Sequence, residues 1–274
     1  MLHSTLPRPS VGTLIREWRQ RRRLSQLDLA CDADISTRHL SYVETGRASP
    51  SREMLLHLAE RLDVPLRERN TLLTSAGYAP MYRERPLADP ALAAAREAVE
   101  LVLRGHEPYP ALAVDRHWTM LAHNRALAPL LAGVDPALLA PPVNVLRLSL
   151  HPRGLASRIV NLAQWREHVF TRLEHQIAAS ADPVLADLLA ELRALPFDAT
   201  RSSGATIDPS GIAVPLQLDS AHGVLSFIST ITVFGTPIDI TLAELALETF
   251  FPADAHTAEV LRRLGDGQDG AATP

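Results

Sequence analysis

The stretch from Leu24 to Arg47, LSQLDLACDADISTRHLSYVETGR, constrains the fold more than any other part of this 274-residue chain. Ser25 precedes an apolar run and Asp28 follows three residues later, a capping-box pattern that predicts a helix beginning at Gln26. Leu27, Leu29, Ala30 and Ala33 are predicted to form its apolar stripe. This first helix is short, so it needs a partner against which to bury that stripe.

A second short helix is predicted over residues 37–44, with Ser36 as its cap and Gly46 as its stop signal. Leu40 and Val43 are expected to point inward. Two such helices joined by a tight turn are typical of a helix-turn-helix, whose second helix enters the major groove of DNA. The residues left to point outward are Thr37, Arg38, Ser41 and Tyr42.

The pattern LSQxxLA…S…L…ExGR resembles the lambda-repressor/Cro-like, or xenobiotic-response-element, class of regulators. The resemblance implies that Gln26 contacts phosphate and that Thr37 and Arg38 read base edges. Asp34 stands where the family usually has Gly, and Asp tolerates the left-handed conformation better than most residues. An ordinary helical hairpin of a bundle is the alternative. The DNA-binding residues expected from the resemblance and the pattern are Gln26, Ser36, Thr37, Arg38, Ser41, Tyr42, Arg47 and Arg52.

The charge of the chain is unevenly distributed. Residues 1–85 carry fourteen Arg against ten acidic residues, whereas residues 86–274 carry thirteen Arg against twenty-one, and the whole chain has a net charge of −4 without a single Lys. A basic N-terminal part followed by an acidic C-terminal part is typical of a DNA-binding module attached to a domain that does not contact DNA. Guanidinium groups suit bidentate recognition of phosphate or guanine.

Five short helices are predicted in residues 1–78, which we interpret as the DNA-binding domain. The first has Val11, Leu14, Ile15 and Trp18 at helical spacing. A fourth follows Ser51, and a fifth runs from Pro65 to Ala76. Phosphate contacts are expected from the arginines beside the motif, namely Arg19, Arg21, Arg22, Arg23, Arg47 and Arg52.

Residues 79–90 carry three prolines without periodicity and are predicted to be a linker. Residues 91–264 have the element order of a PAS-like antiparallel sheet with helices over one face, which makes the fold class a two-domain α+β protein. Residues 265–274 are predicted to be a disordered tail. The elements expected in the second domain are strands at 110–115, 118–123, 211–218, 224–234 and 245–250, and helices at 90–104, 125–131, 155–178, 183–195 and 255–264.

This second half also resembles a family, through YPALAVDRHWTMLAHNRAL, NVLRLSLHPRGL, NLAQWREHVFTRL and FGTPIDITLAELALETFFPAD. These segments are similar to the MmyB-like C-terminal domain of helix-turn-helix regulators. The resemblance implies that the domain binds small apolar ligands, fatty-acid-like ones among them. The loop PFDATRSSGATIDP carries no motif of that family, so the ligand of this chain can differ from those of other members.

A sensor needs a concave, mostly apolar cavity with a few placed polar groups. Asn124, His151 or Arg172 could anchor a carboxylate, although Asn124 also reads as a helix cap and His151 as a loop residue. The alternative interpretation of the apolar candidates for ligand binding is that they are ordinary core residues. The candidate ligand-binding residues are Trp118, Met120, Asn124, Leu146, His151, Trp165, Phe170, Arg172, Phe227 and Phe234.

Several function classes lack support in the sequence. No catalytic, metal-binding or phosphate-binding motif occurs, so we expect no enzyme, no metal and no cofactor. The single cysteine, Cys31, is expected to be a small buried apolar residue. No run of eighteen apolar residues and no signal-peptide pattern is present, so a cytoplasmic protein without a membrane span is expected.

The sequence therefore predicts a homodimeric transcription regulator that binds a double-stranded DNA operator through residues 1–78. Residues 91–264 are expected to sense a small apolar ligand and to help dimerise the chain. The first alternative is that the second domain is only a dimerisation or protein-interaction module. The second is an enzyme fused to a DNA-binding head.

Overall fold

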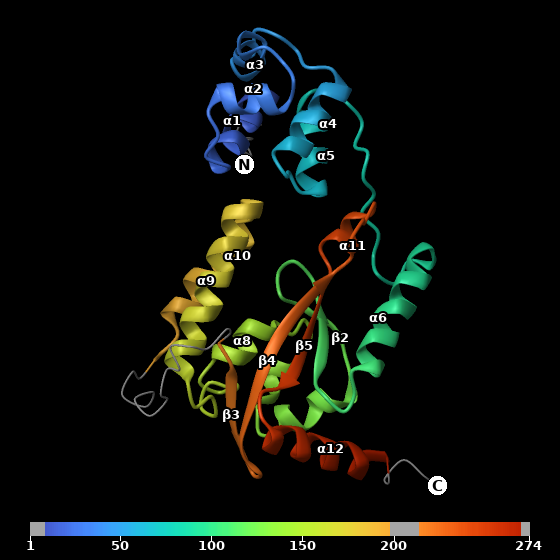
Figure 1. Ribbon diagram of the computed structural model, residues 1–274, viewed down its shortest axis with the longest axis vertical. Coiled ribbons are helices and arrows are strands. Elements are labelled where there is room, and N and C mark those ends of the chain that lie inside the picture. Colours follow the sequence, from blue (N-terminus) through green and yellow to red (C-terminus); the bar gives the residue numbers. More distant parts are fainter. Residues whose placement is uncertain (1–8, 198–213, 270–274) are drawn as a thin grey trace, which may run out of the picture. The chain divides into compact units, whose positions relative to one another are not determined.

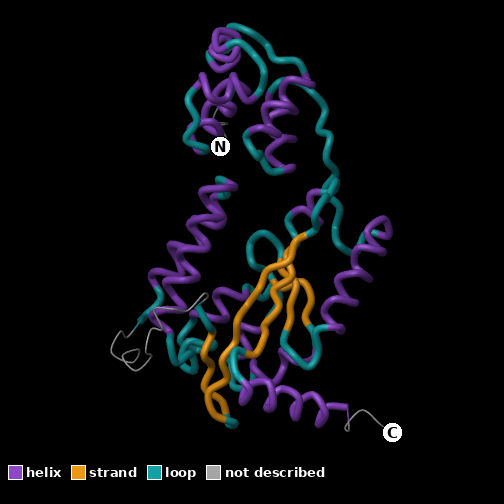
Figure 2. The backbone as a smooth tube through the Cα atoms, in the orientation of Figure 1, coloured by secondary structure: helices purple, strands orange, loops and turns teal. Residues whose placement is uncertain are grey.

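The computed structural model describes residues 9–197 and 214–269 and divides them into two compact units. The first unit comprises residues 9–85, and the second, apart from two short segments, comprises residues 86–269. Residues 9–85 form helices alone, and the rest of the described chain combines a sheet with helices (Figures 1 and 2). The predicted two-domain α+β fold class is confirmed.

Five helices form the first unit, as predicted. Serines at positions 10, 25, 36 and 51 cap four of them by accepting a hydrogen bond from a backbone N–H in the first turn. The capping box predicted at Ser25 and Asp28 is complete. The helices are α1 (Val11–Arg21), α2 (Gln26–Asp32), α3 (Thr37–Glu44), α4 (Arg52–Arg61) and α5 (Leu66–Ser75).

The core of this unit is mainly aliphatic. Ile15, Leu40 and Leu58 are fully buried in it, Trp18 is its buried aromatic residue, and Tyr78 packs against it. Gly12 lets α1 approach α3 closely, because a Cβ atom at this position would lie 2.3 Å from the carbonyl oxygen of Val43. The turn between α2 and α3 holds Asp34 at φ 50°, the left-handed conformation expected at this position.

Two predictions about α2 were wrong. Leu27, assigned to the apolar stripe, is 61% exposed, and Cys31, expected to be buried, is exposed. The two residues are four positions apart and therefore share one face of the helix. Leu29 and Ala30 occupy the other face and are fully buried, so α2 faces the core with those residues alone.

The second unit is organised around one antiparallel sheet with the order β2-β1-β5-β4-β3. The long strand β4 pairs with β3 through residues 223–227 and with β5 through residues 227–233. All five predicted strands are present. They are β1 (Ala111–Val114), β2 (Met120–His123), β3 (Leu216–Ser220), β4 (Gly223–Val233) and β5 (Ala246–Pro252).

Helices cover both faces of the sheet, so the prediction that they lie over one face was wrong. On one face α6 (Ala93–Gly105) packs Val99 and Leu103 against alanines of β1. On the other face a larger core gathers residues of β1, β3 and β4 with those of several helices, Trp165 and Leu173 among them. The helices that contribute to this core include α8 (Val145–Leu150), α9 (Leu162–Ser180), α10 (Pro183–Ala194) and α12 (Ala255–Asp269).

The long helix α9 begins at Leu162, seven residues later than predicted. The preceding backbone is engaged elsewhere, since Ile159 forms a bridge with Leu218 and the side chain of Asn161 bonds both Pro215 and Gln217. At the other end of the domain, α12 continues to Asp269 rather than ending at Leu264. Four short helices complete the elements, namely η1 (Pro90–Leu92), η2 (Arg125–Leu131), α7 (Pro136–Leu139) and α11 (Ile240–Ala243). The predicted strand residues 211–213 and the last five residues of the predicted tail lie outside the described residues.

Candidate functional site

The first candidate site is the outward face of α3. Ser36 accepts a hydrogen bond from the backbone N–H of His39 and so fixes the start of the helix. Arg38 is exposed, while Thr37, Ser41 and Tyr42 are half-buried. The face therefore offers one guanidinium and three hydroxyl groups, all of which can bond base edges or phosphates.

Tyr42 organises the two arginines nearest to this face. Nε of Arg38 donates to the hydroxyl of Tyr42 at 3.0 Å, and the guanidinium of Arg38 lies 5.4 Å from the ring centroid. The guanidinium of Arg47 lies 5.9 Å from the same ring. These contacts hold both cations beside the recognition helix while leaving most of their N–H donors free for nucleic acid.

A buried ion pair ties α3 to α1. Glu44 is 3% exposed and accepts a two-pronged contact from Arg19, at 2.7 and 2.9 Å. Gln26 adds a hydrogen bond of 2.8 Å to the same carboxylate. Burial by itself opposes ionisation, but the bonds from Arg19 and Gln26 and the Arg19 charge outweigh it and hold the pKa of Glu44 below its usual range.

These contacts revise the roles predicted for several polar residues. The side-chain amide of Gln26, expected at a phosphate, is engaged with Glu44. Arg19 is buried rather than solvent-facing, and Arg22 donates to the carbonyl oxygens of Leu62 and Asp63. The arginines near α3 that remain exposed are Arg21, Arg23, Arg38, Arg47 and Arg52.

The second candidate site is a cavity in the larger core of the second unit. Its volume is about 70 Å³, and its walls come from β1, β2, β3, β4, β5, η2, α8 and α9. Five of the predicted ligand-binding residues line it, namely Met120, Leu146, Trp165, Arg172 and Phe227. The remaining walls are almost entirely aliphatic, so the cavity suits an apolar group.

Arg172 and Glu248 are the charged groups of this cavity, and they bond one another at 3.1 Å. The guanidinium of Arg172 also lies 4.2 Å from the ring centroid of Trp118. In the described part of the chain, Nε of Arg172 is the one fully buried side-chain nitrogen or oxygen without a hydrogen-bond partner. An N–H at the cavity wall is thus left for an acceptor atom.

The other predicted ligand-binding residues have different surroundings. Asn124 is buried and bonds the backbone of Leu103, Tyr109 and Ala111, so its amide joins the end of α6 to the start of β1 rather than capping a helix. Phe234 packs on the α6 side of the sheet. His151 accepts from the backbone N–H of Arg153. Trp118 and Phe170 belong to the larger core without lining the cavity.

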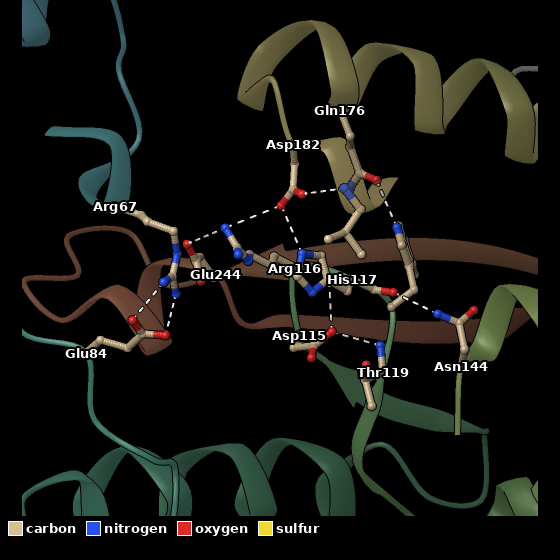
Figure 3. A network of polar contacts seen from close by, with 12 residues as sticks. Arg67, Glu84, Asp115, Arg116, His117, Thr119, Asn144, Gln176, Asp182 and Glu244 are labelled. Atoms are coloured by element: carbon tan, nitrogen blue, oxygen red, sulfur yellow. Dashed lines mark hydrogen bonds and ion pairs between the residues drawn. The ribbon is translucent and has the colours of Figure 1, made fainter. Parts of the chain in front are cut away.

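A polar network that the sequence did not reveal holds the β1–β2 turn (Figure 3). Asp182 accepts from His117 at 2.9 Å and pairs with Arg116, while Nε1 of Trp118 donates to Gln176. Burial opposes ionisation of Asp182, but bonds from His117 and the Val184 N–H and the nearby Arg116 charge lower its pKa. Asp182 also caps α10, because its side chain accepts a hydrogen bond from the backbone N–H of Val184. Its role in the network follows from a contact 65 positions away.

Metal sites and membrane spans are both missing from the part of the chain that the structure describes. Within residues 9–197 and 214–269, no cluster of His, Cys, Asp and Glu side chains could hold a metal ion. Among the same residues no helix combines the length and the apolar character needed to cross a membrane.

Comparison with known proteins identifies both halves of the chain. Residues 10–72 match the helix-turn-helix domain family, and residues 95–264 match the MmyB-like transcription regulator ligand binding domain. No curated protein matches the sequence. The second match covers more than half of the chain. The chain therefore belongs to the MmyB-like transcription regulators and carries their ligand-binding domain behind a DNA-binding helix-turn-helix domain.

Proposed function

We propose that this regulator reads operator DNA through the outward face of α3 and senses a small apolar ligand in the cavity of its second unit. The observation that carries the proposal is the cavity itself, whose walls are mostly apolar and include Arg172, a residue with an unpartnered N–H. The proposed domains are residues 1–78 for DNA, 79–90 as a linker, and 91–264 for ligand binding and dimerisation.

Arg38 is proposed as the main base-reading residue, because it is exposed and positioned by Tyr42. Arg38→Ala is expected to cost about 1–3 kcal/mol of binding free energy at one base position of the operator. Arg47→Ala serves as the matched control, since a phosphate contact weakens binding to all sequences alike and lowers the salt slope by about one unit. The measurement is equilibrium binding to an operator selected from random DNA and to its single-base variants. Unchanged affinity and specificity for folded Arg38→Ala would contradict the assignment.

The regulator is proposed to bind an inverted repeat as a homodimer. One helix-turn-helix contacts only a few base pairs, and a twofold pair reaches half-sites about one helical turn apart. Changing the spacing of the half-sites by about five base pairs should therefore abolish high-affinity binding, because the second α3 then faces away from its groove. Sedimentation of the complex gives the stoichiometry. One chain bound to one half-site at working concentrations would refute the proposal.

The ligand is proposed to be fatty-acid-like in its apolar body. The cavity volume of about 70 Å³ is well below the roughly 300–1,000 Å³ of ordinary ligand sites, so binding requires side chains to move aside. Met120 is a suitable residue for this, since its unbranched side chain is flexible. A carboxylate here would face Glu248, so an uncharged acceptor, such as an ester or a protonated acid, fits Arg172 better.

Ligand and operator are expected to alter each other's affinity. If methyl octanoate changes operator affinity about five-fold, then operator must change the affinity for methyl octanoate by the same factor. Titration of the full chain measures the affinity for operator with and without methyl octanoate, and the affinity for methyl octanoate with and without operator. Native mass spectrometry establishes the bound stoichiometry. A chain that binds neither methyl octanoate nor octanoic acid, and yet dimerises and binds DNA, would favour the second domain as a dimerisation or protein-interaction module.

A further inference from the structure

The long strand β4 has one edge that is only partly paired. On one side it pairs with β5 through residues 227–233, whereas on the other side β3 pairs with it only through residues 223–227. Figure 1 shows β4 continuing past the end of β3. The segment with a strand on one side alone is residues 228–233, ISTITV, and we call it the β4 edge.

The chain that leads into β3 does not pair with the β4 edge. Val214 packs against the larger core instead, and the carbonyl oxygen of Pro215 accepts a hydrogen bond of 2.8 Å from the side chain of Asn161. Five of the six residues of the β4 edge are exposed, and Val233 is 61% exposed. Among the residues that the structure describes, none therefore extends the sheet beyond the β4 edge.

The register of the sheet shows which backbone groups of the β4 edge point outward. Successive residues of a strand direct their N–H and C=O groups to alternate sides. Ser226 accepts from the N–H of Ala253, just after β5, so the even-numbered residues of β4 direct these groups to β5. Ser229, Ile231 and Val233 therefore direct theirs away from β5, where no described strand pairs with them.

The β4 edge lacks the usual protection against pairing with another strand. Natural edge strands are protected by charged side chains, by proline or by a bulge. Residues 223–236 contain no charged residue and no proline, and the register with β5 is continuous from residue 227 to residue 233. Isoleucine, valine and threonine make up most of the β4 edge and favour extended structure. The β4 edge is thus suited to accept one more strand.

We propose that the β4 edge pairs with the β4 edge of a second copy of this chain, antiparallel about a twofold axis at Ile231. In this register Ile231 faces Ile231 of the copy and Ser229 faces Val233, so each outward N–H and C=O of these residues finds a partner. Thr230 then faces Thr232 of the copy, and no charged side chains oppose one another. The contact is isologous, so it closes a dimer rather than forming a fibre. The inference rests on the proposed homodimer and names the surface that forms it.

The length of the β4 edge fits this pairing. Phe227 is the last residue of β4 that pairs with β3, through Leu216. In the proposed register Phe227 would face Gly235 of the copy, which lies beyond the end of its β4 at Val233. The strand of the copy therefore ends before it reaches β3, and the two strands do not compete for the same backbone groups.

The test is sedimentation equilibrium of the full chain with two variants that change the same two positions. Thr230→Lys/Thr232→Lys places lysine opposite lysine across the twofold axis, and the dimer Kd should rise at least about tenfold. Thr230→Lys/Thr232→Glu places lysine opposite glutamate, and the dimer Kd should return close to that of the wild type. The two variants are matched, because both residues are exposed and both variants lose the hydrogen bond between Thr230 and Thr249.

Two further variants separate pairing from added charge and from misfolding. Ile238→Lys adds a charge at a residue that is 85% exposed and lies beyond the end of β4, so it should leave the dimer Kd unchanged. Ile231→Pro removes an outward N–H without removing a bond to β5, so it should weaken the dimer at least about tenfold. This variant tests the proposal if the double-lysine variant does not fold.

Three results would overturn the proposal. The first is an equal dimer Kd for the wild type and for folded Thr230→Lys/Thr232→Lys, which would leave the homodimer intact and place its contact elsewhere. The second is a Thr230→Lys/Thr232→Glu dimer as weak as the double-lysine one, because the two positions would then not face one another. The third is a free wild type that is monomeric at working concentrations, which would leave the β4 edge to a strand of another protein. Stoichiometry on an inverted repeat would then decide separately whether the homodimer on DNA survives.

Discussion

Replacing Glu44 by glutamine is expected to destabilise the first unit by about 3–5 kcal/mol, because it leaves the guanidinium of Arg19 buried without its counter-charge. The loss should appear in α1 and α3, which the pair joins, and it should displace the recognition helix. Hydrogen exchange of the amides in these two helices measures the effect within the unit. Operator affinity should fall with the stability of the unit.

The same variant should change how stability depends on pH. The pKa of Glu44 is lowered in the folded chain, so its contribution is fully present above the unfolded-state pKa and is lost as pH falls through the folded-state value. In Glu44→Gln this part of the acid-induced loss should disappear. If the free energy of unfolding falls equally at low pH in the wild type and in Glu44→Gln, the pair contributes nothing to folding.

Glu84→Gln is the matched control. Glu84 also bonds an arginine of the first unit, Arg67, at 2.5 and 2.7 Å, but the side chain of Glu84 is 54% exposed. An exposed ion pair contributes roughly 0–1 kcal/mol. The two variants make the same chemical change, so a difference between them reports burial. Equal destabilisation by both would contradict the argument.

The first unit could be predicted from its sequence because its signals are local. The capping serines and the 3.6-residue period lie within each helix, and the strained turn at Asp34 follows from one position. The errors concern which face of a short helix is buried. Seven residues of α2 make barely two turns, and nothing in that segment tells whether Leu27 or Leu29 meets α1 and α3.

The second unit was predictable in its order of elements but not in its sites. Alternating and β-branched residues marked the strands, and their order fits an antiparallel sheet. In contrast, the start of α9 depends on a bridge between Ile159 and Leu218, which are far apart in sequence. The partner of Arg172 lies 76 positions away, so the sequence marked Arg172 as a candidate anchor and gave no sign of Glu248.

Arg166 shows the same limit for charged residues. In sequence it is one of three arginines in the helix predicted over residues 155–178, and a charged residue on a helix normally indicates a solvated face. Its burial follows from the return of α10, whose end brings Phe197 over the guanidinium. These aromatic contacts of Arg166 cannot be inferred from the spacing of residues along α9.

Arg172→Met is expected to cost the second unit about 3–5 kcal/mol, because Glu248 then remains in the core without its partner. Glu248 is 4% exposed and lies between Leu112 and Ile231 in the register of the sheet. Trp118 reports this unfolding directly, since its ring lies 4.2 Å from the guanidinium. Chemical denaturation followed by tryptophan emission should show the midpoint fall without a change in slope.

Replacing both partners tests whether the pair serves stability or ligand binding. In Arg172→Met/Glu248→Leu no charge is left unpaired, and Leu at position 248 can pack beside its aliphatic neighbours, so most of the lost stability should return. The double variant nevertheless lacks the unpartnered N–H of Arg172, a residue that lines the cavity. It should therefore fold, bind operator DNA and no longer respond to methyl octanoate. A double variant as unstable as Arg172→Met would contradict the stability argument, and one that still responds to methyl octanoate would show that Arg172 does not bind it.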